Sequence, residues 1–89
     1  MGDRIGGIGV EKPLERVLSS LGTRLKALRG QRGWTLERLS QLSKLSEPYL
    51  SRLESGSRQP SLAALLTLAQ VYEIPVRTLL DGDGLTGDD

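Results

Sequence analysis

The chain has 89 residues, 37% of them hydrophobic, which suffices for one small core, so we expect a single domain. It contains no Cys and no His, which excludes disulfides and removes the commonest general base and metal ligand, so we expect no enzyme, cofactor or metal site. The net charge of +1 is segregated: residues 21–60 carry eight Lys or Arg and three Glu, whereas residues 73–89 carry five acids and one Arg.

The basic centre has a net charge of +5 and the C-terminal stretch one of −4. A basic surface favours contact with a polyanion, although such a run is also common on a face that only meets solvent. Leucine dominates the apolar positions, and the chain has no Phe, one Trp and two Tyr. Because strands concentrate β-branched and aromatic residues, this bias favours helices, and we expect an all-α fold.

Neither a signal peptide nor a membrane span is indicated, since no apolar run approaches ~18 residues. We therefore expect a cytoplasmic, nucleoid-associated protein with no membrane contact. Residues 1–10 contain four Gly without helical or strand periodicity, and we expect residues 1–12 to form a flexible arm. Residues 81–89 alternate Asp and Gly and end in two Asp, which predicts an acidic disordered tail. The folded domain is expected at residues 13–80.

The first helix is predicted to begin at Pro13, which suits a first helical turn because its missing N–H is not needed there. Gly22 leaves open whether residues 14–18 form a separate turn, and Gly30 and Gly33 are expected to end the helix. The apolar residues of this segment recur every three or four positions and therefore share one face: Leu14, Val17, Leu18, Leu21, Leu25 and Leu28.

Two short helices follow. Thr35 is expected to cap a helix that ends near Leu42, and its inward residues are Leu36, Leu39 and Leu42. After a short turn at residues 43–45, Ser46 is expected to cap the next helix, which Gly56 ends. Pro48 is tolerated in its first turn, and Leu50 and Leu53 point to the core.

The fourth helix is predicted from its cap, Ser61, to about Tyr72. Because no charged residue occurs between positions 61 and 72, we expect it to be the central buried helix. Its predicted inward face consists of Leu62, Leu65, Leu66, Leu68, Ala69 and Tyr72. A short fifth helix is expected at residues 76–80, after Pro75.

Two short helices joined by a three- or four-residue turn form a helix-turn-helix arrangement, which alone is common. The sequence from Leu21 to Leu80 resembles the Cro/CI-type, or XRE-like, helix-turn-helix family of bacterial and phage regulators. The resemblance rests on LKALR at 25–29, GWTL at 33–36, LS at 39–40, YLSRLESG at 49–56, PSL at 60–62, LLTLA at 65–69 and IPV at 74–76. It implies a compact five-helix, lambda-repressor-like domain that binds double-stranded DNA and regulates transcription.

The turn departs from the family pattern at two positions. The family often has Ala at the position of Ser40 and Gly at that of Lys44. The Ser40 hydroxyl can bond back to its own helix. Lys44 would have to adopt a positive φ if the turn keeps its usual shape, at a cost of about 1 kcal/mol or more.

The resemblance implies that a recognition helix at about 46–55 enters the major groove. We predict base contacts from its open side, by Glu47, Pro48, Ser51 and Arg52. Arg52 is suited to guanine O6 and N7, Glu47 to the cytosine amino group, and Pro48 to a thymine methyl. The alternative for each of them is a solvated surface position.

Phosphate contacts are predicted where backbone N–H groups and polar side chains flank that helix. They come from Thr35, Leu36, Ser46, Tyr49, Arg58 and Gln59. At the second helix, the Thr35 hydroxyl and the N–H groups near Leu36 would face a phosphate, aided by the helix dipole. The other cations of the basic centre are expected to add only a diffuse field: Arg24, Lys26, Arg32, Arg38 and Lys44.

The resemblance further implies an ion pair between Arg29 and Glu54, which assigns Glu54 a structural role. Trp34 is expected in the core. We expect a homodimer on a roughly palindromic operator, with interface candidates at residues 10–21 and at Val76, Leu79 and Leu80. An alternative is a protein-interaction module, antitoxin-like or an adaptor, that uses the same helical scaffold.

Overall fold

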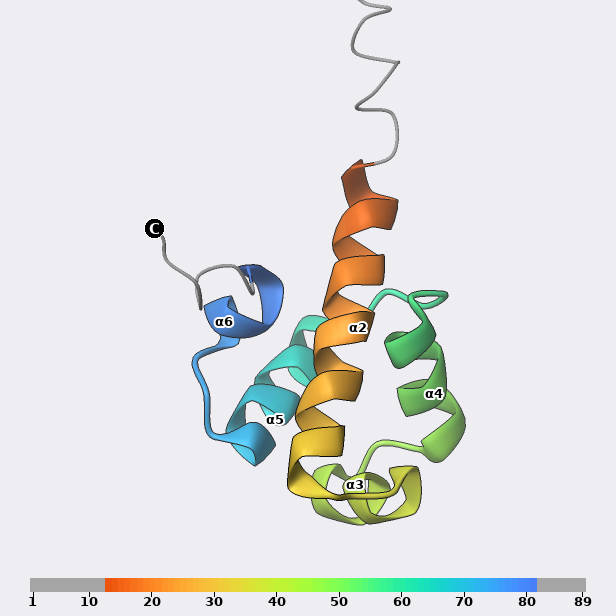
Figure 1. Cartoon of the computed structure of the whole chain (residues 1–89), viewed down its shortest axis with the longest axis vertical. Coiled ribbons are helices and arrows are strands. Elements are labelled where there is room, and N and C mark those ends of the chain that lie inside the picture. Colours follow the sequence, from red (N-terminus) through yellow and green to blue (C-terminus); the bar gives the residue numbers. More distant parts are fainter. Residues whose placement is uncertain (1–12, 82–89) are drawn as a thin grey trace, which may run out of the picture.

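The computed structural model describes residues 13–81, within which the regular elements are all helices (Figure 1). They are α2 (Pro13–Arg32), α3 (Leu36–Ser43), α4 (Glu47–Ser55), α5 (Leu62–Tyr72) and α6 (Val76–Asp81). The expected all-α fold is confirmed. The arm predicted at residues 1–12 and the tail predicted at 81–89, apart from the backbone of residue 81, lie outside the described residues.

Helix α2 runs through both of its glycines without interruption. Gly22 therefore does not separate an N-terminal turn, and the prediction that Gly30 helps to end the helix is wrong. The helix ends at Gly33, whose φ of +69° turns the chain while its N–H donates to the Gly30 carbonyl at 3.0 Å. A glycine inside a helix costs only about 1 kcal/mol relative to alanine, and the packing of α2 against the other helices offsets this cost.

The apolar stripe of α2 is buried only in its middle. Leu21 and Leu25 are each 2% exposed, whereas Leu14 and Val17 are 53% and 45% exposed. The first turns of α2 extend beyond the helices that pack against its later part (Figure 1). The N-terminal end of the stripe is therefore surface and not core.

Both short helices begin at their predicted caps. Thr35 Oγ1 accepts the N–H of Arg38 at 3.0 Å, and Ser46 Oγ accepts the N–H of Tyr49 at 3.2 Å. In α3, Leu39 is buried, but Leu42 is 36% exposed, so its predicted inward position is wrong. The eight-residue helix offers too narrow a buried face to cover all three of its leucines.

The turn between α3 and α4 has the left-handed residue that the resemblance implies, although this residue is not a glycine. Lys44 has φ +67°, which confirms the positive φ expected there, and its N–H donates to the Ser40 carbonyl at 2.8 Å. The Ser40 hydroxyl donates forward to the Leu45 carbonyl at 2.6 Å, and not back into its own helix as suggested. Ser40 therefore closes the turn.

Helix α5 begins at its predicted cap, with Ser61 Oγ accepting the Ala64 N–H at 3.0 Å. Its inward face differs from the expected one, because Leu62 and Leu66 are 68% and 50% exposed while Ala64 is buried. Nearly every position of this helix is apolar, so periodicity could not separate the buried side from the exposed one.

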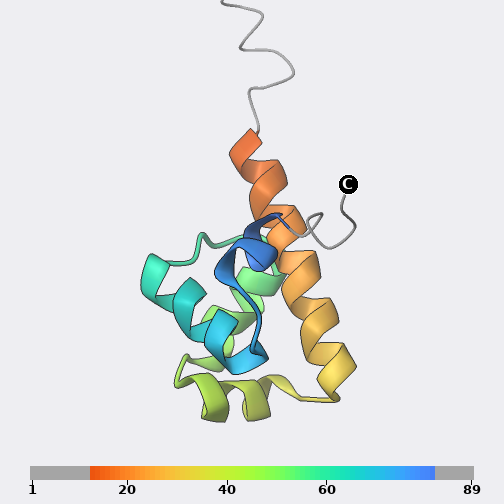
Figure 2. The ribbon, with the colours of Figure 1, turned by 90° about the vertical axis from the view of Figure 1, so that its left-hand side faces the viewer.

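The core lies where the five helices meet. Figure 2 shows α2 along one side of the domain and α5 along the opposite side, with α3 across the end where α2 finishes. The buried cluster comprises Leu21, Leu25, Leu39, Leu50, Leu53, Leu68, Ala69, Tyr72 and Leu79. Trp34 packs against this cluster and stacks on Tyr72, with ring centroids 5.6 Å apart, so its expected core position is confirmed.

Candidate nucleic-acid interface

Helix α4 has one buried and one open side. Leu50 and Leu53 are 1% and 2% exposed and anchor the helix to the core. The four residues predicted to contact bases are all exposed on the other side: Glu47, Pro48, Ser51 and Arg52. An exposed helix of nine residues with a polar outer face has the size and polarity to enter a major groove.

The surface beside this helix is hollowed. An open depression of about 560 Å³ lies between α3 and α4 and is lined by Leu36, Ser40, Ser46, Glu47, Pro48 and Ser51. A smaller one of about 220 Å³ shares Leu36 and Ser51 with it and reaches Lys26 and Arg29 of α2. Three of the predicted base-contacting residues, Glu47, Pro48 and Ser51, thus line the larger depression together with Leu36 and Ser46, which are predicted to contact phosphates.

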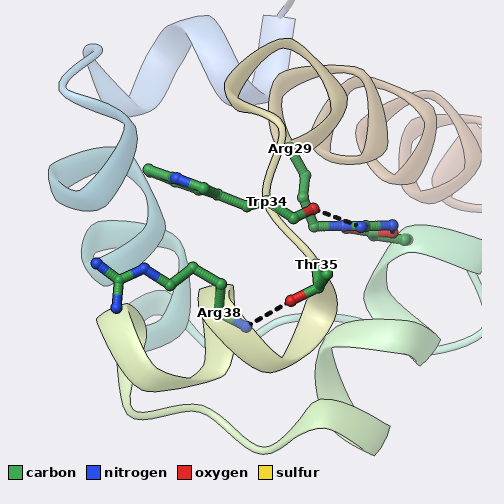
Figure 3. Close-up of polar contacts among 5 residues, drawn as sticks. Arg29, Trp34, Thr35 and Arg38 are labelled. Atoms are coloured by element: carbon green, nitrogen blue, oxygen red, sulfur yellow. Dashed lines mark hydrogen bonds and ion pairs between the residues drawn. The ribbon is translucent and has the colours of Figure 1, made fainter.

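The N-terminus of α3 carries Thr35 as its cap and Leu36 as its first residue. Figure 3 shows Thr35 with its oxygen accepting the Arg38 backbone N–H. Helix geometry leaves the N–H groups of Leu36 and Glu37 without an intrahelical acceptor, and the Thr35 hydroxyl keeps its own proton for donation. This end of α3 therefore offers donors suited to an anion.

Tyr49 has a role that the sequence reasoning missed. Its hydroxyl oxygen accepts the Ser61 N–H at 3.1 Å, which ties α4 to the start of α5. The Arg58 guanidinium lies 5.3 Å from the centre of the same ring, an arrangement that places this cation beside α4. The Tyr49 hydroxyl proton stays available to a phosphate. Gln59 is exposed in the same loop.

Arg29 and Glu54 join α2 to α4 through two hydrogen bonds. Arg29 Nε donates to Glu54 Oε2 at 2.8 Å, and Nη2 donates to Oε1 at 3.0 Å. Arg29 Nη1 also donates to the Trp34 carbonyl at 2.9 Å, directly before the Thr35 cap (Figure 3). The hydrogen bond to Glu54 raises the pKa of Arg29, so the guanidinium stays charged. Glu54 faces Arg29 and not the open side of α4.

Two cations expected to contribute only a diffuse field have internal partners. Arg24 donates to the Leu79 carbonyl and to Ser20 Oγ, and so ties α2 to α6. Arg32 donates to the Tyr72 carbonyl at 2.7 Å, and its guanidinium lies 5.4 Å and 5.6 Å from the ring centres of Trp34 and Tyr72. The hydrogen bonds from Arg24 to Leu79 and from Arg32 to Tyr72 join residues far apart in the sequence, and no local pattern signals them.

Within residues 13–81, no group of three or more Asp, Glu, His or Cys side chains is placed to hold a metal ion. None of the helices in that range has the length and apolar character needed to cross a membrane.

Comparison with known proteins places this arrangement in a family. A model of the helix-turn-helix domain matches residues 20–81. The chain is 45% identical over 65 residues to the HTH-type transcriptional regulator DdrOP3 of Deinococcus deserti, a match covering 73% of this chain and 50% of that protein. It is 34% identical over 67 residues to the HTH-type transcriptional regulator SutR of Escherichia coli, covering 75% of this chain and 38% of that protein. The chain thus spans half or less of these two relatives.

A solved structure is similar over most of its own length. The restriction-modification controller protein C.AhdI from Aeromonas hydrophila superposes with a TM-score of 0.67 at 39% identity, covering 70% of this chain and 94% of that one. The family model spans most of the chain, and the fold agrees with that of the solved relative. The chain belongs to the helix-turn-helix family of transcriptional regulators, of the Cro/CI type that its sequence resembles.

Proposed function

We propose that this chain is a sequence-specific, double-stranded DNA-binding transcriptional regulator that acts without catalysis, in the cytoplasm at the nucleoid. One observation carries the proposal: the short capped helix α4 exposes Glu47, Pro48, Ser51 and Arg52 beside the open N-terminus of α3. Base-reading groups and phosphate-binding groups are both needed for specific binding, and Glu47 and Ser51 line the same depression as Leu36 and Ser46.

In this proposal α4 enters the major groove with its N-terminal end first. Arg52 binds guanine O6 and N7, Glu47 accepts from a cytosine amino group, and Pro48 contacts a thymine methyl. Ser51 lies one position from Arg52 on the same open side and adds a hydroxyl that pairs with either donors or acceptors.

The phosphate contacts come from both ends of this surface. On one side are the Thr35 hydroxyl, the Leu36 N–H and the Ser46 hydroxyl at the helix N-termini. On the other side are Tyr49, Arg58 and Gln59, with Arg58 held against the Tyr49 ring. These contacts set the position of α4 in the groove and carry no sequence information themselves.

We further propose that the protein works as a homodimer on a roughly palindromic operator, with half-sites about 34 Å apart. The exposed side of α5 supports this, because Leu62 and Leu66 are largely exposed and no charge occurs between positions 61 and 72. Of the interface candidates taken from the sequence, Leu79 is fully buried, whereas Leu14, Val17 and Leu80 are exposed. The Tyr49–Ser61 hydrogen bond ties the start of α5 to α4, and in this proposal a two-fold axis beside α5 brings two recognition helices to one face of DNA.

A second candidate function is protein interaction without DNA binding. It is favoured by an open depression of about 740 Å³ between α2 and α6, lined in part by Val17, Ala27 and Leu80. Apolar surface of this kind is a common docking site for a partner helix. We therefore chose an experiment that separates the two functions.

The experiment measures binding of a fluorescent duplex of random sequence between about 50 and 200 mM salt. A DNA-binding protein loses affinity linearly in log–log form, with a slope of about −0.9 per neutralised phosphate. Arg58→Ala should make this slope less steep by about one phosphate, whereas Val17→Ser should leave it unchanged. A folded protein that shows no duplex binding at the lowest salt would exclude the DNA-binding proposal and favour a protein partner.

A further inference from the structure

The C-terminal half of α4 lies so close to α2 that the contact requires a glycine. A Cβ atom added to Gly22 would lie 2.5 Å from the Glu54 carbonyl oxygen and 2.6 Å from that of Leu53. Gly22 is buried, and the atoms it faces belong to backbone. Backbone atoms cannot swing aside as the end of a flexible side chain can. Any larger residue at position 22 therefore displaces α4.

A second glycine makes the reciprocal contact at the end of α4. Gly56 has φ +79°, and a Cβ there would lie 3.1 Å from the Ser19 Cα. The two glycines thus bring α2 and the end of α4 together backbone against backbone. Gly30, by contrast, lies on the same helix as Gly22 with nothing within 4 Å of its added Cβ.

The opposite side of α4 carries Ser51 and Arg52, both exposed. We propose that Gly22 is a positioning residue for DNA recognition: its missing side chain sets how deeply α4 sits against α2, and hence where Arg52 meets the base edges. The inference rests on the proposed function. Bidentate base contacts demand a fixed geometry, whereas phosphate contacts from loops and long side chains tolerate small shifts.

This role differs from simple packing in what it affects. If Gly22 mattered only for the packing of α2 against α4, its replacement would lower stability. The molecules that still fold would then discriminate between sequences as the wild type does. If Gly22 positions α4, the folded variant discriminates less, while its affinity for unrelated duplex stays nearly constant. The ratio of the two dissociation constants separates these cases, because it is independent of the fraction of folded protein.

The test compares Gly22→Ala with the matched control Gly30→Ala in the full chain. We expect crystal structures to show α4 moved away from α2 only in Gly22→Ala. The ratio of nonspecific to specific Kd, measured on a selected operator and a scrambled duplex, should fall about tenfold or more, the value of one bidentate contact. Gly30→Ala should keep both the position of α4 and the ratio.

If Gly22→Ala does not fold, Gly56→Asn takes its place. Asn tolerates a positive φ, so this change tests the Ser19 contact, which must give by a few tenths of an ångström. An unmoved α4, or a moved α4 with an unchanged ratio, would overturn the proposal. A wild-type protein that does not discriminate between sequences would instead remove the proposed function, and with it this role of Gly22, while the crystal structures would still report on the packing.

Discussion

Arg29 binds both carboxylate oxygens of Glu54, and the same guanidinium binds the Trp34 carbonyl. One side chain of α2 thus holds the end of α4 and the segment that leads into α3. The side chains of Arg29 and Glu54 are only 18% and 8% exposed, so this is a partly buried pair. Such a pair is worth little relative to apolar replacements, but it is costly to break on one side only.

The first prediction follows from this cost. Glu54→Leu should lower the free energy of unfolding by about 2–3 kcal/mol, because Arg29 is left partly desolvated without its carboxylate. Arg29→Met with Glu54→Leu should cost less than the sum of the two single changes. Urea unfolding of the four proteins gives the coupling energy. Additive losses would show that the pair does not act as a unit.

Arg52 and Arg58 should separate base recognition from phosphate binding. Arg52→Ala should weaken binding to the best operator by about 1–3 kcal/mol and relax one base position, because a bidentate contact is lost. Arg58→Ala should weaken binding to all duplexes by a similar factor. Dissociation constants on a set of single-base operator variants measure both effects. Equal loss on every sequence for Arg52→Ala would reassign it to a phosphate.

Lys44 should be a site where glycine stabilises the protein. Its φ of +67° disfavours a residue with a side chain, and its own side chain is exposed. Lys44→Gly should raise the free energy of unfolding by about 1 kcal/mol and Tm by about 4–8 °C for a domain of this size. Gln41→Gly, within regular α3, is the control and should destabilise by a similar amount. A lower Tm for Lys44→Gly would contradict the strain at this turn.

We expect the buried Tyr72 hydroxyl to make the protein less stable at alkaline pH. Burial, more than the nearby Glu54, raises the pKa of its hydroxyl to about 12. Between the unfolded pKa of about 10 and this value, the unfolded chain releases a proton that the native state retains, so stability falls as pH rises. The expected loss is about 2–3 kcal/mol by pH 12.

Tyr72→Phe provides the matched control for this effect. The Tyr72 hydroxyl is buried and has no hydrogen-bond partner among residues 13–81. The Phe variant should therefore be at least as stable as the wild type at pH 7 and should lose the part of the alkaline decline due to position 72. Chemical unfolding between pH 7 and 11.5 measures both. A marked loss at pH 7 would mean that the hydroxyl is satisfied.

The dimer prediction concerns the exposed side of α5. Leu62→Gln with Leu66→Gln should shift sedimentation equilibrium toward monomer, because two largely exposed leucines on an uncharged helix are removed from the interface. Val17→Gln with Leu80→Gln changes two exposed residues between α2 and α6 and should leave the association constant unchanged. The opposite pattern would place the dimer contact at α2 and α6.

Much of the fold was predictable because its signals are local. Thr35, Ser46 and Ser61 each cap the helix expected of them, since a side-chain oxygen at such a position satisfies a free N–H of the first turn. The glycines of α2 gave wrong signals for the helix boundaries, because Gly30 lies within a continuous helix and Gly22 allows a close contact with α4. A glycine signal alone does not distinguish a helix end from a close approach.

The candidate site was predictable in outline only. The exposed side of α4 follows from the spacing of Leu50 and Leu53, which fixes the buried side. The Tyr49–Ser61 and Arg32–Tyr72 hydrogen bonds join separate helices, 12 and 40 positions apart, and depend on tertiary packing. For α5, the uniformly apolar sequence concealed which leucines face outward.

Selection of bound duplexes from a random library at moderate salt measures directly whether this surface recognises a DNA sequence. We expect a two-fold motif whose half-sites are centred about 34 Å apart, and whose best-defined base pair loses its preference with Arg52→Ala. A folded protein that enriches no motif above the starting library would contradict sequence-specific recognition by α4.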